Sequence, residues 1–244
     1  MKIIKQMYQK SQISFIMSII SFLIGCFFIH STIGYPLKVS FTISLIGILP
    51  FLIFFLVVIG KYFLSNKKII NIILTIISGF LTFFLVIYYF IAIFICAIIQ
   101  CDNPITNYKN YEHFIKSDYL LKAFPVEIPD TATNISFYHR VGILQGGTNY
   151  SLYYIDKTIS FEEFDKKYNE IAIWSGRINE YNENFGLLSG AFSNTPVEYK
   201  NEEEFIIYLI DGECDDSGFC NHGDFLLAAY NIKTHEIVYS SDNW

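Results

Sequence analysis

The first hundred residues contain no aspartate and no glutamate, although the whole chain of 244 residues has 23 of them. The same stretch holds seven lysines and no arginine, so its formal charge is +7. The rest of the chain, from Cys101 to Trp244, holds ten basic and 23 acidic residues and has a formal charge of −13. An apolar half without carboxylates followed by a polar, acidic half predicts a membrane anchor that carries a water-soluble domain.

The acidic half also lacks any cluster of lysine and arginine, because its ten basic residues are scattered along the sequence. Binding to nucleic acid, or to the headgroups of anionic lipids, requires such a cluster. We therefore expect no nucleic-acid partner, and we expect the lipid bilayer to be a partner of the first half only.

Three long apolar runs occupy the first half, namely Ile13–Ile33, Phe41–Gly60 and Ile69–Ile99. About 20 helical residues suffice to cross a hydrocarbon layer about 30 Å thick. The connections between the runs are short, so neighbouring helices must run antiparallel. Channels and carriers generally need ionisable groups at mid-membrane depth, and the runs offer only His30, near the end of one of them. The pattern indicates a three-helix transmembrane anchor over residues 1–100.

The positions of the lysines predict the orientation of this anchor. Three lysines precede the first run, one lies in the first connection and three lie in the second connection. Lysine is retained on the cytoplasmic side, so the N-terminus and the second connection are expected there. With an odd number of spans, residues 101–244 then lie outside the cell. We expect a multi-pass protein of a bacterial plasma membrane with an extracytoplasmic C-terminal domain.

The segment Leu23-Ile24-Gly25-Cys26 resembles the cleavage box of bacterial lipoproteins. The residues that follow it continue the apolar run instead of becoming polar, which favours a cysteine inside a membrane helix. Whether the first span is retained or processed at Cys26 stays open.

Residues 101–129 are predicted to be a connector with a helix over Tyr111–Phe124, which ends before a pair of prolines. Residues 130–244 are predicted to form the extracytoplasmic domain. Its first part alternates apolar and polar residues over Asn134–Leu144 and Tyr150–Asp156, with a Gly-Gly pair between the two stretches. This pattern is typical of a β-hairpin.

The strongest helix signal in the chain begins at Ser160. Ser160 and Glu163 have the spacing of a capping box, in which each side chain satisfies a backbone N–H of the first turn. An apolar stripe at steps of three and four then predicts a helix that packs one side against a sheet. The stripe consists of Phe161, Phe164, Tyr168, Ile171, Ser175 and Ile178.

Three further stretches predict strands: Phe205–Ile210, Phe225–Asn231 and Glu236–Ser240. The last two are separated by a short turn. Strands in hairpins with one main amphipathic helix between them predict a small α+β domain with a mostly antiparallel sheet.

Two short motifs carry a resemblance. They are F-P-x-x-I-P over Phe124–Pro129 and L-Q-G-G over Leu144–Gly147. Together they resemble uncharacterised membrane-anchored proteins of Gram-positive bacteria, in which we expect a proline where Val141 stands here. The resemblance covers residues 120–244. It implies an extracytoplasmic domain, with no assigned activity and no catalytic residues.

The densest polar stretch of the chain, residues 211–224, is the candidate recognition loop. A disulfide between Cys214 and Cys220 would close part of it, which the oxidising exterior of a cell permits. The polar side chains that we assign to recognition are Asp211, Glu213, Asp215, Asp216, His222 and Asp224.

The same loop contains ligand types for two kinds of metal site. A calcium loop would use Asp211, Glu213, Asp215 and Asp216, but Asp216 stands where an EF-hand needs its turn glycine. A zinc site built from Cys214, Cys220 and His222 lacks an obvious fourth ligand. We therefore assign neither a metal nor another cofactor.

Catalytic patterns are weak in this sequence. A serine elbow is lacking, and no motif brings Cys220 together with His139 or His235 as a nucleophile and base. Alternating tyrosines at Tyr150, Tyr153 and Tyr154 could form a binding platform, although such a pattern is more typical of a strand in a core.

The function that we predict is a membrane-anchored extracytoplasmic module that binds or senses an unidentified ligand. One alternative is a cell-envelope enzyme with its site in the loop at 211–224. The other is an accessory or immunity-type subunit whose helices associate with another membrane protein. The sequence favours a protein that is not an enzyme without deciding the question.

Overall fold

The computed structural model describes residues 2–64, 67–116, 118–142, 147–181, 187–214 and 223–243. The chain forms two compact units, Met1–Asp102 and Asn103–Trp244. Each unit is described by itself.

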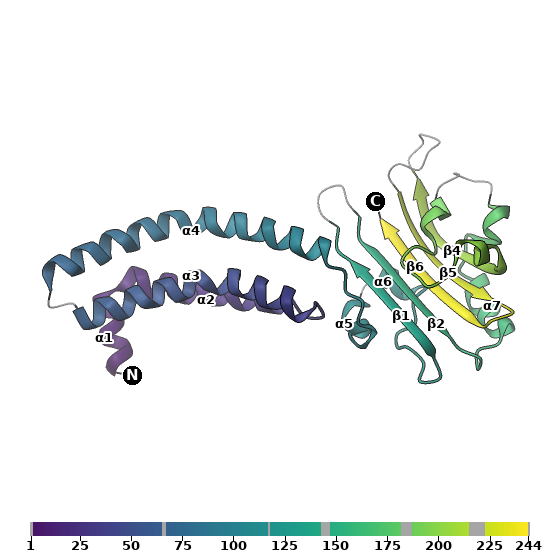
Figure 1. Cartoon of the computed structure of the whole chain (residues 1–244), viewed down its shortest axis with the longest axis horizontal. Helices are drawn as coiled ribbons and strands as arrows, with labels where there is room; N and C mark the ends of the chain where they lie inside the picture. The colour runs from purple at the N-terminus through teal and green to yellow at the C-terminus, as the bar shows by residue number, and fades with distance from the viewer. Residues whose placement is uncertain are drawn as a thin grey trace. The chain divides into compact units, whose positions relative to one another are not determined.

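All the regular secondary structure described in the first unit is helical. A short helix α1 (Lys2–Lys10) precedes three long ones, α2 (Gln12–His30), α3 (Leu37–Leu64) and α4 (Lys68–Asp102) (Figure 1). Each long helix has the length and apolar composition needed to cross a membrane. The prediction of a multi-pass membrane protein with three spans is confirmed, and Cys26 lies within α2.

Small residues line the interior of this unit. Ser14, Ser18, Ser21 and Gly25 recur on α2 at steps of three and four, and all are buried. A side chain at Gly47 of α3 would collide with Phe28, so α2 and α3 approach closely at this level. Ser14 also shares a hydrogen bond with Ser78 of α4, with 2.6 Å between the hydroxyl oxygens. Small residues and hydroxyls of this kind are what holds helices together in lipid.

Pro50 lies inside α3 and has no N–H to donate to the carbonyl four residues earlier, which belongs to Ile46. The hydroxyl of Tyr88 on α4 donates to this carbonyl at 2.7 Å. The neighbouring Tyr89 donates to the carbonyl of Ser21 at 3.3 Å. Tyr88 thereby supplies, from a neighbouring helix, the hydrogen bond that the Ile46 carbonyl lacks because of the proline.

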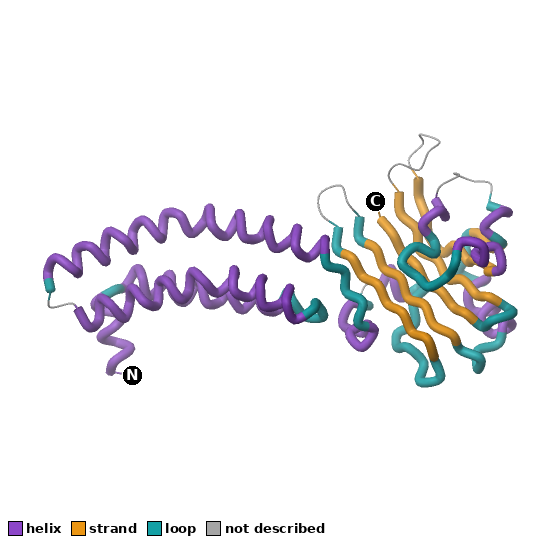
Figure 2. The backbone as a smooth tube through the Cα atoms, viewed as in Figure 1, coloured by secondary structure: helices purple, strands orange, loops and turns teal. Residues whose placement is uncertain are grey.

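The second unit is built on a six-stranded sheet in which all neighbouring strands are antiparallel (Figure 2). The strand order is β1-β2-β6-β5-β4-β3. The predicted class, a helical anchor followed by a small α+β domain, is confirmed. The strands are β1 (Thr133–Arg140), β2 (Asn149–Ile155), β3 (Trp174–Gly176), β4 (Phe205–Cys214), β5 (Gly223–Asn231) and β6 (Glu236–Asn243).

The connector differs from the prediction. Instead of one helix over Tyr111–Phe124, the chain makes the 3₁₀ turn η1 (Tyr108–Asn110) and the short helices α5 (Tyr111–Phe114) and α6 (Asp118–Leu121). The prediction of a single helix was wrong. Ile115 follows the first short helix, Leu120 lies in the second, and both side chains are buried. The segment packs as short turns beside the sheet.

The main helix, α7 (Phe161–Asn169), starts as predicted but ends early. Its capping box is present, with Ser160 and Glu163 each accepting a backbone N–H of the other at 3.2 Å. The predicted continuation through Ser175 and Ile178 was wrong. The backbone N–H of Ile173 binds the carbonyl of Leu209, and the next residues form β3 on the edge of β4.

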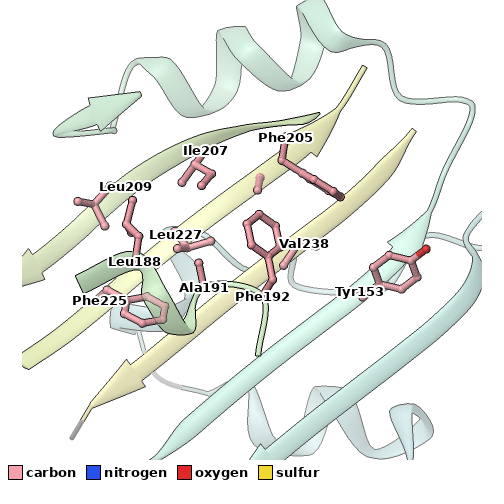
Figure 3. Packing of buried hydrophobic residues seen from close by; sticks show 11 residues of the cluster. Tyr153, Leu188, Ala191, Phe192, Phe205, Ile207, Leu209, Phe225, Leu227 and Val238 are labelled. Atoms are coloured by element: carbon pink, nitrogen blue, oxygen red, sulfur yellow. The ribbon is translucent and has the colours of Figure 1, made fainter. Parts of the chain in front are cut away.

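One face of the sheet, called the η3 face, is covered by the 3₁₀ turn η3 (Leu187–Gly190) and the residues after it. Figure 3 shows Leu188, Ala191 and Phe192 lying over the strands. Further 3₁₀ turns, η2 (Ile178–Glu180) and η4 (Tyr199–Glu204), flank β4. The buried strand residues of the η3 face are Tyr153, Phe205, Ile207, Leu209, Phe225, Leu227, Ala229 and Val238.

The opposite face, called the α7 face, is packed with tyrosine. Phe164 and Tyr168 of α7 lie against tyrosines of three strands, β4, β5 and β6. The phenol of Tyr239 lies at the centre and also packs against Tyr154 of β2. Its hydroxyl oxygen is 3.2 Å from that of Tyr154 and 3.4 Å from that of Tyr168. The four strand residues are Tyr154, Tyr208, Tyr230 and Tyr239, all fully or almost fully buried.

Candidate functional site at the acidic end of the sheet

The strand register gathers carboxylates at one end of the sheet. Glu213 of β4 is opposite Asp224 of β5, and Phe225 next to it is opposite Asp242 of β6. Asp211 lies two residues before Glu213 on β4. We call Asp211, Glu213, Asp224 and Asp242 the acidic end, which lies where the C-terminus is marked in Figure 1. Residues distant in sequence meet here because antiparallel strands place their ends side by side.

The predicted recognition loop connects β4 to β5 at this end. Asp211, Glu213 and Asp224 belong to the two strands, whereas Asp215, Asp216 and His222 lie outside the described residues. Cys220 also lies outside them, and Cys214 ends β4. The disulfide therefore stays a prediction. Within the described ranges, no group of three or more acidic, histidine or cysteine side chains is placed to hold a metal ion.

A lysine and a tyrosine face the carboxylates on the α7 side. Lys122 lies 3.9 Å from Asp211, but both side chains are largely exposed, so this ion pair contributes little. The hydroxyl of Tyr119 is buried and has no hydrogen-bond partner in the described part of the chain. Burial and the charges of Asp224 and Asp211 raise the pKa of Tyr119. The phenol therefore stays protonated and can donate a hydrogen bond next to two carboxylates.

Polar groups gather on the η3 face at the same end. Asp242 lies between Asn149 of β2 and Phe225 of β5 in the register. Burial raises the pKa of the Asp242 carboxyl, against a hydrogen bond from Asn149 and the charge of Arg140. Ser240, one pleat further along β6, is fully buried, and its hydroxyl has no partner among the described residues. Buried polar groups normally have partners, so these atoms require an explanation.

His139 is the third buried group of this kind. Its ring stacks on Tyr150 with 4.2 Å between ring centroids, and burial lowers its pKa to about 4. The Nδ1 atom has no partner in the described part of the chain. The described residues of this unit contain three buried side-chain polar atoms without a partner, namely this Nδ1 atom and the hydroxyls of Tyr119 and Ser240. His139 and Ser240 belong to the half of the sheet that carries the acidic end, and Tyr119 lies in α6, near Asp224 and Asp211.

The tyrosine platform suggested by the sequence is wrong. Tyr153 and Tyr154 are 5% and 1% exposed. The hydroxyl of Tyr153 donates to Glu236 at 2.7 Å, and that of Tyr154 bonds to Tyr239. Both side chains are therefore parts of the core.

The two histidines considered as bases also have other positions. His139 is buried in an aromatic stack. His235 lies in the turn between β5 and β6, at the opposite end of β5 from Asp224, and its Nδ1 is 2.8 Å from the hydroxyl of Tyr230. Neither position supports a base at the acidic end.

Sequence reasoning missed Tyr119, Asn149, Ser240 and Asp242. A signal was present for the last two, because the apolar pattern of the final strand changes to Ser240-Ser241-Asp242-Asn243. Such a polar continuation of a strand indicates that its end leaves the apolar core.

Comparisons with protein-family models, with curated proteins and with solved structures gave no match to this chain. The functional argument therefore depends on the geometry of the site.

Proposed function

We propose that this membrane-anchored protein is a binding module whose second unit recognises a cationic, hydrogen-bonding partner at the acidic end of the sheet. One observation carries the proposal. Carboxylates from three strands share this end with buried polar atoms that lack partners in the described residues.

Charge supports the cationic partner. The half of the chain that contains this unit has a formal charge of −13, and two more aspartates follow directly after β4 in the sequence. A surface of one sign steers partners of the opposite sign and suppresses binding of like-charged ones. Lys122 pairs with Asp211, and the charge of Arg140 acts on Asp242, so the four carboxylates of this end still outnumber the basic side chains near them.

The module is extracytoplasmic in this proposal. The distribution of lysines around the three spans supports a cytoplasmic N-terminus, and three spans then deliver the second unit to the outside. A membrane-impermeant amine reagent applied to intact bacterial cells tests this. We expect it to label Lys109 and Lys157 in the second unit before lysis. Labelling of these lysines only after lysis would invert the orientation.

The binding itself is tested with full-length protein in nanodiscs of zwitterionic lipid and a short oligolysine peptide as the probe. The double variant Asp211→Asn/Asp224→Asn should bind the probe about tenfold more weakly, because it removes two charges from the site. The control Glu202→Gln/Glu203→Gln removes the same charge near the start of β4, at its other end. It should change the affinity by less than about twofold.

Equal losses in both variants would show that the probe responds to net charge alone, and the proposed site would be wrong. An oligoglutamate peptide should not bind either variant or the wild type. Binding of that peptide at the same affinity as oligolysine would also overturn the proposal.

A further inference from the structure

Lysines gather at one end of the first unit, where α3 is followed by α4 and where α1 lies (Figure 1). The only acidic residue in the sequence of this unit, Asp102, is at the opposite end of α4, so this end has no carboxylate of its own. We call these residues the lysine end. They are Lys5 and Lys10 of α1, Lys61 of α3, Lys67 in the connection and Lys68 at the start of α4.

Lys61 is the buried member of the lysine end. It lies in the last turn of α3, and only 7% of the residue is exposed. One turn earlier, Val57 and Val58 are buried as well, so the surroundings are apolar. The ammonium group of Lys61 has no hydrogen bond or ion pair with any residue that the structure describes. A buried charge is costly without a partner, so this position favours an anion from outside the protein.

Helix α1 runs across the same end. The backbone at Ser11 leaves helical geometry, with φ −151° and ψ 49°, and α1 therefore points away from the axis of α2 (Figure 1). The ammonium of Lys10 donates to the carbonyl of Tyr62 at 3.3 Å, which ties α1 to the end of α3. Ile3 and Ile4 of α1 are 61% and 59% exposed. Exposed isoleucines beside lysines are typical of a helix that lies in a membrane interface, with the lysines at the level of the headgroups.

We propose that the lysine end binds the phosphate headgroups of anionic phospholipids, with Lys61 as the buried contact and α1 lying in the membrane interface beside it. A phosphate supplies the charge and the acceptor oxygens that an ammonium group requires. Lysine clusters next to membrane helices recognise anionic lipids by this chemistry. A zwitterionic headgroup carries its own cation and binds more weakly. The inference concerns the first unit alone and depends on neither the acidic end nor the orientation of the anchor.

Lipid titrations test the headgroup. Full-length protein in neutral detergent is titrated with phosphatidylglycerol or with phosphatidylcholine of the same acyl chains, and native mass spectrometry counts the bound lipids. Phosphatidylglycerol should bind about thirtyfold more tightly. Equal affinity for the two lipids would overturn the proposal. Glycerol phosphate, which has a phosphate and no acyl chain, should not bind in the same concentration range. Binding of this probe as tight as that of phosphatidylglycerol would identify a soluble anion as the ligand and also overturn the proposal.

The buried contact is tested with Lys61→Met, which keeps most of the buried stem and removes the ammonium group. This variant should bind phosphatidylglycerol about fivefold more weakly and phosphatidylcholine unchanged. The control Lys38→Met removes the same charge from an exposed side chain at the opposite end of α3. It should change either affinity by less than about twofold. Equal losses in the two variants would mean that the lipid responds to net charge, and the site would be wrong.

Exposed lysines provide a test that leaves the packing of the helices intact. Lys67→Gln/Lys68→Gln should weaken binding of phosphatidylglycerol about tenfold. Lys109→Gln/Lys157→Gln removes the same charge from exposed positions of the second unit and should leave the affinity within about twofold. A similar loss in both pairs would overturn the proposal, whether or not Lys61→Met folds.

Hydrogen exchange reports the position of α1. In nanodiscs, the α1 amides should exchange about tenfold more slowly with phosphatidylglycerol than with phosphatidylcholine, because the anionic surface holds the helix in the interface. Ile3→Gln/Ile4→Gln should abolish this difference. The control Ile171→Gln/Ile173→Gln changes two exposed isoleucines of the second unit and should preserve it. Unchanged exchange of the α7 amides shows that each variant is folded. Equal exchange of α1 in the two lipids would overturn the proposal.

Discussion

The two units of the protein bury tyrosine hydroxyls in different ways. In the first unit, Tyr88 and Tyr89 donate to backbone carbonyls of other helices. In the second unit, Tyr153 and Tyr208 donate to the carboxylates of Glu236 and Asp165, each at 2.7 Å. Tyr168 and Tyr230 of the same unit donate to backbone carbonyls, each at 2.8 Å. The difference follows from composition, because the first hundred residues contain no carboxylate that could accept.

The source of hydrogen-bond acceptors for buried hydroxyls differs between the membrane helices and the sheet. Within a membrane helix nearly every carbonyl is used by the helix itself, so a proline that frees one creates a place for a hydroxyl. In the second unit carboxylates accept as well, beside backbone carbonyls that lie outside the strands, such as those of Ala123 and Ile159. The η3 face provides a third case, since its centre is apolar and needs no acceptors.

The largest effect should come from this apolar centre. Leu227 is fully buried, and Leu227→Ala should lower the free energy of unfolding by about 3 kcal/mol, because it leaves a cavity. Urea unfolding of the full-length protein in detergent measures it through tryptophan fluorescence, since both tryptophans belong to the second half of the chain. Ile232→Ala, at an exposed turn residue, should cost less than about 0.5 kcal/mol. Similar costs for the two variants would show that the η3 face is not a packed core.

The next effect depends on pH and comes from the α7 face. Burial lowers the pKa of His139 from 6.5 to about 4. Between these values the unfolded chain binds a proton that the folded chain does not, so stability falls as the pH is lowered through this window. The loss should reach about 3 kcal/mol near pH 4 at most.

His139→Phe isolates this contribution. The variant keeps an aromatic ring in the stack with Tyr150 and has no titrating group. Urea titrations at several pH values should show a shallower fall in stability between pH 6.5 and 4 than in the wild type. A parallel pH dependence in the two proteins would mean that His139 is protonated in the folded state.

A smaller effect tests the tyrosine hydroxyls of the second unit. Tyr239→Phe removes the hydroxyl that links Tyr154 and Tyr168 while keeping the ring. We expect a loss of about 1–2 kcal/mol, because one buried hydroxyl loses its partner and the other retains only its bond to the Ala123 carbonyl. The same urea titration provides the value. A loss as large as that of Leu227→Ala would erase the distinction between the two faces.

The smallest effect concerns the first unit and requires a double-mutant cycle. Tyr88→Phe should destabilise the packing of α3 and α4 by about 1 kcal/mol. In a Pro50→Ala background, residue 50 regains an N–H that can bond to the carbonyl of Ile46, so the same change should cost almost nothing. Steric trapping in lipid bicelles measures both. Equal costs in the two backgrounds would mean that the hydroxyl does not replace the bond lost at Pro50.

Local patterns predicted much of this fold. The apolar runs predicted the three long helices, and the Ser160–Glu163 pair predicted the start of α7. The end of α7 was not predictable from spacing, because Ile171, Ser175 and Ile178 continue the helical period. A long-range contact decides the outcome, since Trp174–Gly176 gains an edge position on β4.

The site was harder to predict because it depends on strand order. Asp211 and Asp224 are close in the sequence, and both lie in the one polar segment predicted for recognition. Asp242 lies at the same end of the sheet, on its η3 face, only through the pairing of β6 with β5. Tyr119 lies near Asp211 and Asp224 only through the packing of the connector. The buried small residues of α2 recur at steps of three and four in the sequence. The apolar residues between them dominate the pattern, so the stripe was not predicted.

The two borders of the sheet have unequal lengths, eight residues in β1 and three in β3. A protein whose sheet presents a long border on each side can polymerise into a fibril, since every added copy offers a fresh template. Here strand β3, with three residues, is too short to act as the second template. The longer border is partly occupied, because His139 already pairs with Ile105 and Phe137 is buried, so neither border offers a long free template.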